Sequence, residues 1–320
     1  MFKVSVIIPV FGVEKYIRRC AESLFNQTLD SIEFIFIDDC TPDNSLVVLS
    51  RIIEEYRPRF AEMNWNVRIE RMPTNSGLPA VRRHGINCAT GNYVVHCDSD
   101  DWVDRDMYNL MYSNAQINNA DIVICDYYCS DGIKKESFIS AYSEEKEVLI
   151  NQLLFEKGNW AIWDVLVKRE LYLGEGISFP KDNMGEDFAL LIQLLYRSKR
   201  ISHLKLPLYY YYNNVTSITH QVTKEKKINL FRQACNNIEI VRDTLLNDPR
   251  NLYYDGVVNV MSLQRNILTP FIDEREVYIM WKERFPGLSK KVLLSLKISI
   301  KHKLRVAQIY FLGYIASIRK

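Results

Sequence analysis

The chain has 320 residues, of which 48% are hydrophobic and 25% are charged, as expected for a globular protein that buries a sizeable core. Its formal net charge of +2 excludes a strong general affinity for nucleic acid, and no basic stretch interleaved with aromatic residues lies near the acidic motifs. This length predicts a main domain with an appendage.

The cysteines and the first residues indicate a cytoplasmic protein. Seven cysteines are an odd number, and Cys125 and Cys129 have no second pair or nearby histidine to complete a metal site. A reducing cytoplasm fits this usage best. The opening MFKVSVIIPV is too short for a signal peptide, and no apolar run reaches the roughly 18 residues that span a bilayer. We therefore expect neither export by that route nor a transmembrane segment.

The first third of the chain alternates short apolar runs with stretches of helical periodicity. The expected strands are residues 4–10, 34–37, 67–71 and 93–97, and the expected helices are residues 14–26, 44–56 and 78–89. Such alternation predicts an α/β fold, a parallel sheet with helices on both faces. Ligands of these sheets bind in the crevice beyond the carboxyl ends of the strands.

Three carboxylates, Asp98, Asp100 and Asp101, directly follow the fourth expected strand. Because side chains alternate along an extended chain, Asp98 and Asp100 can point one way while Ser99 and Asp101 point the other. Two carboxylates that close together need a proton, a basic side chain or a cation, and Mg²⁺ or Mn²⁺ with the phosphates of a nucleotide would complete the site. The alternative is that these acids form a turn and cap the helix that follows.

Several motifs together resemble the family 2 glycosyltransferases, over residues 4 to about 220. They are VSVIIPVFGVEKYIRRCAESLFNQT, FIFIDDCTPDNS, NSGLPAVRRHGINCATGNYVVHCDSDDWV and, further along, NMGEDF. The resemblance implies the GT-A fold, a Rossmann-like mixed, mostly parallel sheet flanked by helices. It also implies an inverting transfer, in which an acceptor hydroxyl attacks the anomeric carbon of a nucleotide sugar while a metal-bound nucleoside diphosphate leaves.

The same resemblance assigns residues to the nucleotide. Pro9, Val10 and Phe11 match the loop that borders the nucleobase, and Asp39 matches the acid that contacts uracil in relatives that use UDP-sugars. Asp38 is the adjacent acid of that motif, and it can equally be a turn or cap residue before the next helix.

Arg82 keeps its register in Val81-Arg82-Arg83, where the family usually has Ala-Arg-Asn. Its guanidinium is expected near the diphosphate or holding the acidic loop, and a solvated arginine on the helix is the alternative. In the acidic loop the resemblance places the metal on Asp100, with Asp98 also close to it and directed towards the ribose or sugar. Ser99 is expected beside the nucleotide sugar.

Inverting transfer needs a general base, because a sugar hydroxyl attacks poorly until its proton is removed. Asp187 matches the acid that supplies the base in this family, and Glu186 is its positioning neighbour, although two acids also favour the start of a helix. Trp160 and Trp163 match the acceptor side, where tryptophan stacks on sugars. Core packing is their alternative role.

One family feature is missing. The family commonly has an arginine ahead of a short Ser-Ile-Thr stretch, and here residues 213–219 read NNVTSIT. His220 can stand in for it as a donor or ligand, whereas His84 and His96 are treated as incidental.

From residue 221 onward the pattern changes to longer helices, expected at residues 224–246, 252–268 and 274–284. We therefore expect a catalytic domain over residues 1–220 and a helical region over residues 221–320. Residues 289–320 carry eight Lys or Arg residues and no Asp or Glu, interleaved with apolar residues. Such a tail either lies on an anionic membrane surface or packs on the protein with a solvated basic face.

The function expected from these observations is transfer of a sugar, most simply from a UDP-sugar, to a glycan or lipid-linked acceptor in bacterial surface polysaccharide synthesis. The enzyme would work in the cytoplasm, peripherally on the inner face of the cell membrane. A non-catalytic nucleotide-sugar or glycan-binding module of the same fold is the alternative, but it would not need the base Asp187. A nucleotidyltransferase is disfavoured because Phe11-Gly12-Val13-Glu14 lacks a glycine-rich basic loop.

Overall fold

The structure is a computed structural model that describes residues 1–213 and 223–318. These residues form two compact units, each assembled from three segments of the chain. The first unit contains Met1–Lys146, Trp160–Lys181 and residues 197–213, and the second contains Glu147–Asn159, Asp182–Tyr196 and residues 223–318. The chain therefore passes between the units well before residue 220, where the sequence analysis places the boundary.

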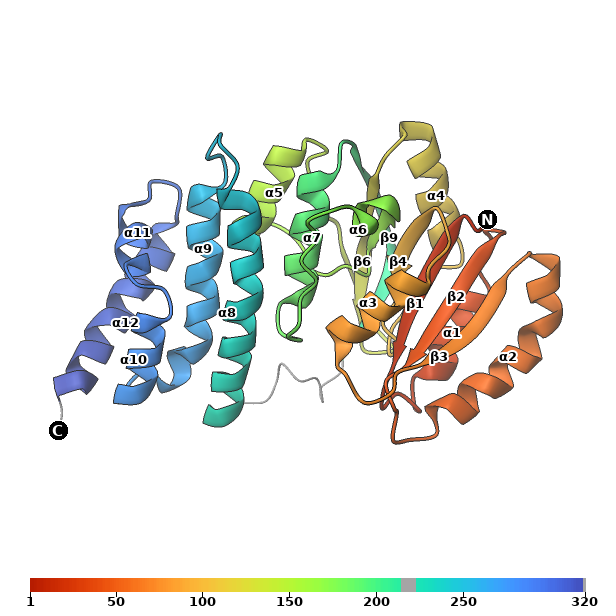
Figure 1. The fold of residues 1–320 in the computed structure, drawn as a ribbon, viewed down its shortest axis with the longest axis horizontal. Coiled ribbons are helices and arrows are strands. Elements are labelled where there is room, and N and C mark those ends of the chain that lie inside the picture. The colour runs from red at the N-terminus through yellow and green to blue at the C-terminus, as the bar shows by residue number, and fades with distance from the viewer. Residues whose placement is uncertain (214–222, 319–320) are drawn as a thin grey trace. The chain divides into compact units, whose positions relative to one another are not determined.

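The first unit is built on a mixed sheet (Figure 1). Within the described residues the sheet has nine strands in the order β3-β2-β1-β4-β8-β6-β9-β5, and β7 pairs with β6. The strands are β1 (Val4–Val10), β2 (Ile32–Asp38), β3 (Asn66–Arg71), β4 (Tyr93–His96), β5 (Trp102–Val103), β6 (Ile122–Ser130), β7 (Lys135–Phe138), β8 (Val165–Lys168) and β9 (Ile201–Tyr212). The longest ladders, β1 with β2 and β6 with β9, are parallel, whereas β8 pairs antiparallel with β4 and β6.

Helices cover both faces of this sheet, as the sequence predicts. They are α1 (Ile17–Phe25), α2 (Ser45–Glu62), α3 (Leu78–Cys88), α4 (Met107–Asn118) and the short α6 (Glu170–Leu173). Alternate residues of β1, from Val4 to Val10, share one core with side chains of α1, α2 and α4. Ile7 faces the other way, towards α3, where a Cβ on Gly85 would lie 2.4 Å from Ile7 Cγ2. A glycine at this position therefore allows α3 to pack directly on the sheet.

The predicted elements of the first third are confirmed, with small differences at their ends. The second helix continues past its predicted end at Tyr56 and includes Pro58, and beyond the proline the side chain of Phe60 packs in the core. The fourth strand ends at His96, one residue early. The acidic residues that follow it therefore lie in a turn, in which Asp101 N–H donates to the Asp98 carbonyl over 3.1 Å.

The second unit is helical. Its helices are α5 (Lys146–Leu154), α7 (Glu186–Arg197), α8 (Lys224–Leu246), α9 (Tyr254–Arg265), α10 (Arg275–Glu283), α11 (Leu288–Leu294) and α12 (Ile300–Ile318), with a 3₁₀ turn at Asn266–Phe271. The side chain of Leu154 packs against Gly256 of α9, which groups α5 with the C-terminal helices. The centre of the unit holds the fully buried Trp281, with the Arg265 guanidinium 4.0 Å from its ring centroid.

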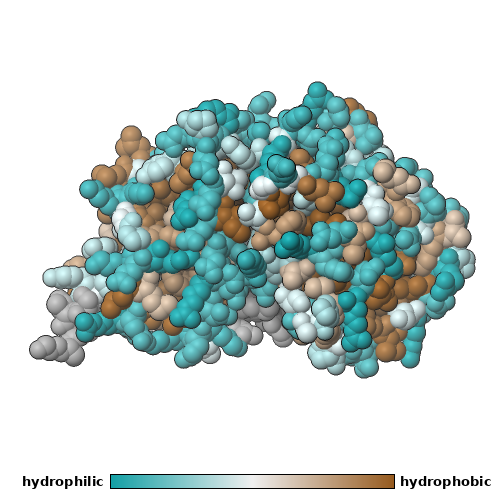
Figure 2. Space-filling model, viewed as in Figure 1, coloured by the Kyte–Doolittle hydropathy of each residue, from teal (hydrophilic) through white to brown (hydrophobic). Residues whose placement is uncertain are grey.

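The basic tail is not one helix but two, because residues 295–299 separate α11 from α12. Val306 and Ile309 are buried in the unit, so part of the tail packs as a structural helix. Leu296 and Ile300, by contrast, are 98% and 75% exposed. On the face shown in Figure 2, hydrophilic residues cover most of the surface and apolar residues reach it in separate groups. Within the part of the chain that the structure describes, no helix combines the length and apolar character needed to cross a bilayer.

Candidate functional site

The strand order creates a switch point between β1 and β4. From β1 the chain continues outwards to β2 and β3, and it returns to β4 on the other side of β1. The carboxyl ends of β1 and β4 are therefore neighbours, because these strands are parallel. Open α/β sheets bind ligands at such a point, and here the two strands are followed by residues 11–13 and by the acidic loop of residues 97–101.

The loop after β1 is fixed in place by the loop after β2. Three of its backbone N–H groups donate to side chains there: Gly12 to Thr41 Oγ1 over 2.9 Å, Val13 to Ser45 Oγ over 3.1 Å and Glu14 to Asp43 Oδ2 over 2.9 Å. Gly12 has a φ of +68°, which a residue with a Cβ rarely adopts. The loop therefore has a defined shape before any ligand binds.

The predicted nucleobase residues end up with different exposures. Val10 is fully buried, Pro9 is partly exposed, and Phe11 is 48% exposed. A large apolar side chain at the switch point can cover the face of a base. Phe11 therefore suits ligand contact, while Val10 supports the loop from within.

The two neighbouring acids after β2 have separate structural contacts. The carboxylate of Asp39 accepts hydrogen bonds from the N–H groups of Ser76 over 2.7 Å and Gly77 over 3.0 Å, so it orders the loop before α3. Asp38 accepts from Thr41 N–H over 2.8 Å and lies 3.2 Å from the Arg71 guanidinium. The contacts of Asp38 match its alternative role as a turn residue.

Arg82 lies beneath the acidic loop. Its guanidinium is 3.1 Å from Asp98 Oδ1, and its side chain is 1% exposed, compared with 28% for Asp98. This contact corresponds to the expected role in holding the acidic loop and disagrees with a solvated arginine on the helix face. A buried guanidinium also offsets part of the negative charge that the loop collects.

The carboxylates of the acidic loop differ in what they can still bind. Asp101 is buried, and its two oxygens accept from the Tyr209 hydroxyl over 2.6 Å and from Tyr212 N–H over 2.7 Å. Asp100 and Asp98 are partly exposed, and Ser99 is buried. Burial, together with the nearby charge of Asp98, raises the pKa of Asp100 to about 6. Burial is the larger cause and the charge of Asp98 adds to it, so the protein itself stabilises the ionised form of Asp100 poorly.

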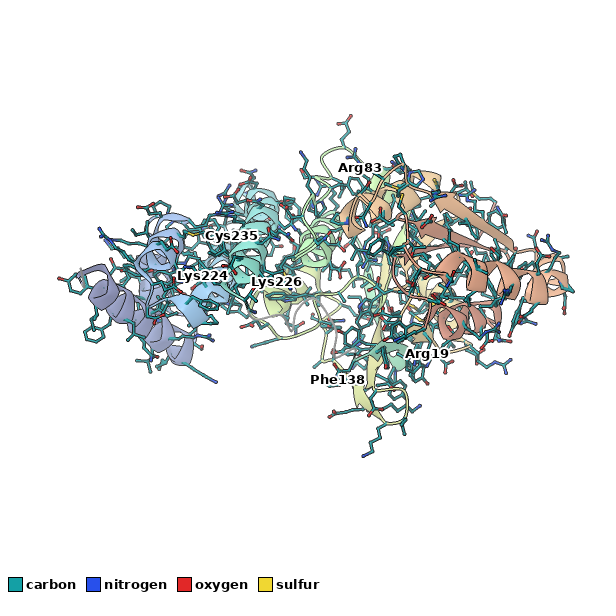
Figure 3. All side chains as sticks on the ribbon, turned by 90° about the horizontal axis from the view of Figure 1, so that it is seen from below. Arg19, Arg83, Phe138, Lys224, Lys226 and Cys235 are labelled. Carbon is teal, nitrogen blue, oxygen red and sulfur yellow. The ribbon has the colours of Figure 1, made fainter. Side chains whose placement is uncertain are left out.

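Arg19 and Tyr209 were not predicted to belong to the site. The Tyr209 hydroxyl accepts from Asp98 N–H over 3.1 Å as well as donating to Asp101, so it connects both ends of the acidic loop. Arg19, labelled in Figure 3, donates to the Asp100 carbonyl over 2.8 Å while its guanidinium lies 3.8 Å from the ring centroid of Trp102. Arg19 is 81 positions from Asp100 and Tyr209 is 108 positions from Asp101, and no local pattern in the sequence indicates such contacts.

Trp163 is buried, which fits core packing, the alternative role that the sequence leaves open for it. It is 5% exposed, and its ring stacks on Tyr209 with 4.1 Å between centroids and 14° between planes. Since its face is already covered, Trp163 supports Tyr209 from below and is not available as a platform for an acceptor sugar. Trp160 is partly exposed, so its acceptor role stays a prediction.

Glu186 and Asp187 belong to the second unit, where they form the first turn of α7. Glu186 is 2% exposed and Asp187 is partly exposed. The preceding loop is held by α8, because Gln233 accepts from Met184 N–H over 3.1 Å and Asn237 donates to the Asp182 carbonyl over 2.6 Å. The catalytic roles of the two acids stay predictions.

The three histidines considered in the sequence have different outcomes. His220, like residues 214–219 before it, lies outside the described residues. His96 is fully buried 3.3 Å from the Tyr172 hydroxyl, and burial with the nearby charge of Arg82 lowers its pKa well below 6.5, so it is a neutral core residue. His84 lies partly exposed on α3, close to Glu70 and Cys88.

The acidic loop fits a hard divalent cation. Mg²⁺ and Mn²⁺ take oxygen ligands, usually one or two carboxylates together with phosphate oxygens of a substrate. Asp100 and Asp98 offer such oxygens, whereas both oxygens of Asp101 are already used within the protein. The like charges that raise the pKa of Asp100 are the charges that such a cation would neutralise.

Comparisons with known proteins indicate the family to which the chain belongs. The family model described as glycosyl transferase family 2 matches residues 5–164. Two glycosyltransferases of Bacillus subtilis (strain 168), the putative EpsH and EpsJ, are 33% and 31% identical over 69% and 68% of the chain. The matched regions cover 64% and 62% of those proteins, so the chain spans a little under two thirds of their length.

The fold is also found in a solved structure. The crystal structure of S. aureus TarS 1–349 in complex with UDP-GlcNAc superposes with a TM-score of 0.73 at 17% identity, covering 99% of this chain and 89% of that one. At this level of identity the likeness concerns the fold. It confirms the GT-A architecture that the sequence predicts.

Proposed function

Because this chain belongs to glycosyl transferase family 2, we propose that it transfers a sugar from a nucleotide-sugar donor to a hydroxyl group of an acceptor. The observation that carries the proposal is the acidic loop at the switch point, where Arg82 and Tyr209 hold Asp98 and Asp101 and leave Asp100 partly exposed. A binding site that is fixed before the substrate arrives does not have to be ordered during the reaction.

The donor would lie along the loops that follow β1, β2 and β4. Phe11 and Pro9 would border the base, and Asp39 would hold the loop before α3 against it. Asp100 and Asp98 would hold a divalent cation, which when bound neutralises the diphosphate and stabilises it as a leaving group. UDP is proposed as the nucleotide because TarS, which shares the fold, was crystallised with UDP-GlcNAc.

The proposed chemistry inverts the anomeric centre. Asp187 would accept the proton of the attacking hydroxyl, which becomes a better nucleophile as its proton leaves. Glu186, which is buried in the same first turn, would position Asp187 or the acceptor.

The acceptor is proposed to be a glycan or a lipid-linked glycan at the cytosolic face of a membrane. Two properties of the second unit support this. Exposed apolar residues on and beside α12 include Leu296, Ile300, Leu304 and Phe311. A cavity of about 750 Å³ in the same unit is lined in part by Lys157, Lys297, Lys301 and Arg305. Apolar side chains beside such a basic cavity suit an anionic lipid surface.

The proposal can be tested with purified protein and a panel of UDP- and GDP-sugars in the presence of Mn²⁺. A preferred donor should raise the melting temperature, because a ligand that binds only the folded state stabilises it by mass action. With that donor and a panel of alkyl glycosides, release of the nucleoside diphosphate should depend on the acceptor. A donor that binds without any turnover would favour a binding module, and the absence of any stabilising nucleotide would refute the donor site itself.

A further inference from the structure

A second cluster of potential ligands lies apart from the acidic loop, at the end of β3 and on α3. Glu70, His84 and Cys88 each place one ligand atom within 4.8 Å of the other two. His84 and Cys88 are four residues apart on α3, so they share one face of the helix, and His84 Nε2 lies 3.6 Å from Cys88 Sγ. We propose that these three residues form a binding site for a transition-metal ion, with Zn²⁺ the best match.

The donor atoms determine this choice of metal. Imidazole nitrogen, thiolate sulfur and carboxylate oxygen are the three ligand types of protein-bound zinc, at about 2.0–2.3 Å from the ion. A tetrahedral ion at those distances spaces its ligands by about 3.3–3.8 Å, and the separation of His84 Nε2 from Cys88 Sγ falls in this range. Mg²⁺ prefers an all-oxygen shell, so this site differs chemically from Asp98 and Asp100.

The surroundings of the cluster permit a metal ion to enter. All three side chains are partly exposed, which leaves the fourth position open to water or to an external ligand. Within the described part of the chain Cys88 is a free thiol. The three ligand atoms are already close together, so the side chains need little rearrangement to bind a metal ion. His84 and Cys88 are also held at a fixed spacing because both lie on α3.

Arg68 is the nearest competitor for the carboxylate. Its Nε lies 3.6 Å from Glu70 Oε1, which is longer than a hydrogen bond. Arg68 also approaches the buried Glu33 to 3.5 Å and donates to the Cys88 carbonyl over 2.5 Å. These other two contacts would keep Arg68 in place while Glu70 turns to a cation. The competition predicts that Zn²⁺ binds more tightly when Arg68 is replaced by Gln.

A metal ion here would join two elements that flank an important loop. β3 and α3 are connected by residues 72–77, and Ser76 and Gly77 in that loop donate their N–H groups to Asp39. An ion held by Glu70 on one side and by His84 and Cys88 on the other would restrain both ends of the loop. The site would therefore act as a clamp beside the proposed donor site, without touching the reacting atoms.

Cobalt provides a direct test on the full chain, because a thiolate bound to Co²⁺ gives a near-ultraviolet charge-transfer band that carboxylate ligands do not give. Chelator-stripped wild-type protein should develop this band at one equivalent of Co²⁺, and Zn²⁺ should abolish it. Cys88→Ser should lose the band. His84→Ala and Glu70→Gln should weaken Co²⁺ binding by at least about tenfold. Loss of a residue that only supports a metal ligand already costs about that much, and loss of a ligand itself should cost no less.

Two controls separate this site from other metal-binding groups. Cys129→Ser removes another partly exposed thiol and should keep the band, and Asp100→Ala should keep it as well because the acidic loop contains no sulfur. Absence of the band from the wild-type protein would overturn the proposal, and so would its persistence in Cys88→Ser. None of these outcomes depends on glycosyl transfer, so the metal site and the proposed function can fail separately.

Discussion

The guanidinium of Arg82 lies 3.1 Å from Asp98 Oδ1 with only 1% of the arginine side chain exposed, so the loop that carries Asp100 is attached to α3 by an ion pair whose arginine is buried. A lysine at this position would keep the positive charge but not the planar fork. A hydrogen bond between charged groups contributes about 1.5–3 kcal/mol, so Arg82→Lys should weaken Mn²⁺-dependent UDP binding by about tenfold or more. Titration calorimetry would measure this change.

The matched control for that variant is the next residue. Arg83, labelled in Figure 3, is exposed, and its guanidinium lies 5.3 Å from the ring centroid of Phe179. Arg83→Lys should bind UDP as tightly as the wild-type protein. Equal losses in the two variants would mean that charge on α3, and not the contact with Asp98, matters for the nucleotide.

Removing the proposed metal ligand should separate metal-dependent from metal-independent binding. Asp100→Ala deletes a partly exposed carboxylate and leaves Arg82, Tyr209 and the rest of the loop in place. Mn²⁺ should therefore no longer strengthen UDP binding in this variant, while the melting temperature without ligand should not fall, because the raised pKa of Asp100 means that its ionised form does not stabilise the fold.

Asp30→Ala is a suitable comparison because it removes an exposed carboxylate that pairs with Lys3. It should leave the metal dependence intact. If UDP binds the wild-type protein as well in EDTA as in Mn²⁺, the assignment of the cation to Asp100 and Asp98 is wrong.

The predicted base can be tested by an isosteric change. Asp187→Asn keeps the shape of the side chain and removes its ability to accept a proton, so acceptor-dependent turnover should fall by about a hundredfold or more. Donor affinity should change little, because the base acts on the acceptor. Asp182→Asn, in the same loop, should stay near wild-type turnover. Loss of turnover in Glu186→Gln but not in Asp187→Asn would move the role to Glu186.

Membrane attachment should depend on the exposed basic side chains of the tail. Lys297, Lys301 and Arg305 are exposed, and each basic residue near an anionic surface contributes about 1 kcal/mol. Replacing all three with Gln should lower the affinity for phosphatidylserine vesicles by roughly a hundredfold, as measured by co-sedimentation. Binding by the wild-type protein should also weaken as salt rises, because the Debye length shortens from about 8 Å at 0.15 M to about 3 Å at 1 M.

These substitutions are preferable to truncation of the tail, which would remove the buried Val306 and Ile309 and disturb the packing of the unit. A control with the same loss of charge places Gln at three exposed positions of the first unit, Lys15, Arg51 and Lys205. An equal loss of vesicle affinity in both triple variants would indicate a general effect of net charge. Failure of the wild-type protein to sediment at any salt concentration would leave the tail with a structural role alone.

Acid should destabilise the second unit through His302. Its ring nitrogens lie 3.0 Å from Ser262 Oγ and 3.0 Å from Asn259 Oδ1, and burial with the charges of Arg305 and Arg265 lowers its pKa from 6.5. The unfolded chain therefore takes up this proton at a higher pH than the folded chain does. The stabilisation is complete above about pH 6.5 and declines as the pH falls below it.

A glutamine at position 302 can keep hydrogen bonds of this kind but does not titrate. Between about pH 8 and about pH 5.5, the melting temperature of His302→Gln should fall less than that of the wild-type protein. The comparison is made between the two proteins because the buried His96 contributes in the same direction in both. If the melting temperatures of the two proteins fall by the same amount, the protonation of His302 is not linked to unfolding.

The parallel part of the sheet could be predicted because its signals are local. Each of the first strands is a short apolar run, and each is followed by a helix with its own periodicity. The rest of the sheet has no such signal, because β5 has two residues and owes its existence to pairing with Tyr209 and Tyr210 of β9. The break in the basic tail at residues 295–299 has no local signal either, since charge and apolar spacing continue through it.

The acidic residues of the candidate site could be predicted from the sequence, but the residues that hold them in place could not. Asp98, Asp100 and Asp101 stand together in the sequence, whereas the different fate of Asp101 depends on Tyr209, 108 positions away. The same limit explains why the sequence leaves two roles open for Trp163, since its stacking on that tyrosine is a contact between distant segments. Contacts between distant segments are set by the folded sheet and have no counterpart in local composition.

The alternation of the chain between its two units has a consequence for how such enzymes diversify. Each unit is assembled from three separate stretches, and two of those in the helical unit, Glu147–Asn159 and Asp182–Tyr196, are inserted among strands of the sheet. A single crossover between two related genes would therefore exchange only part of a unit, leaving α5 or α7 to pack against helices from another parent. New specificities in this architecture should arise by substitution within one lineage more readily than by shuffling of halves.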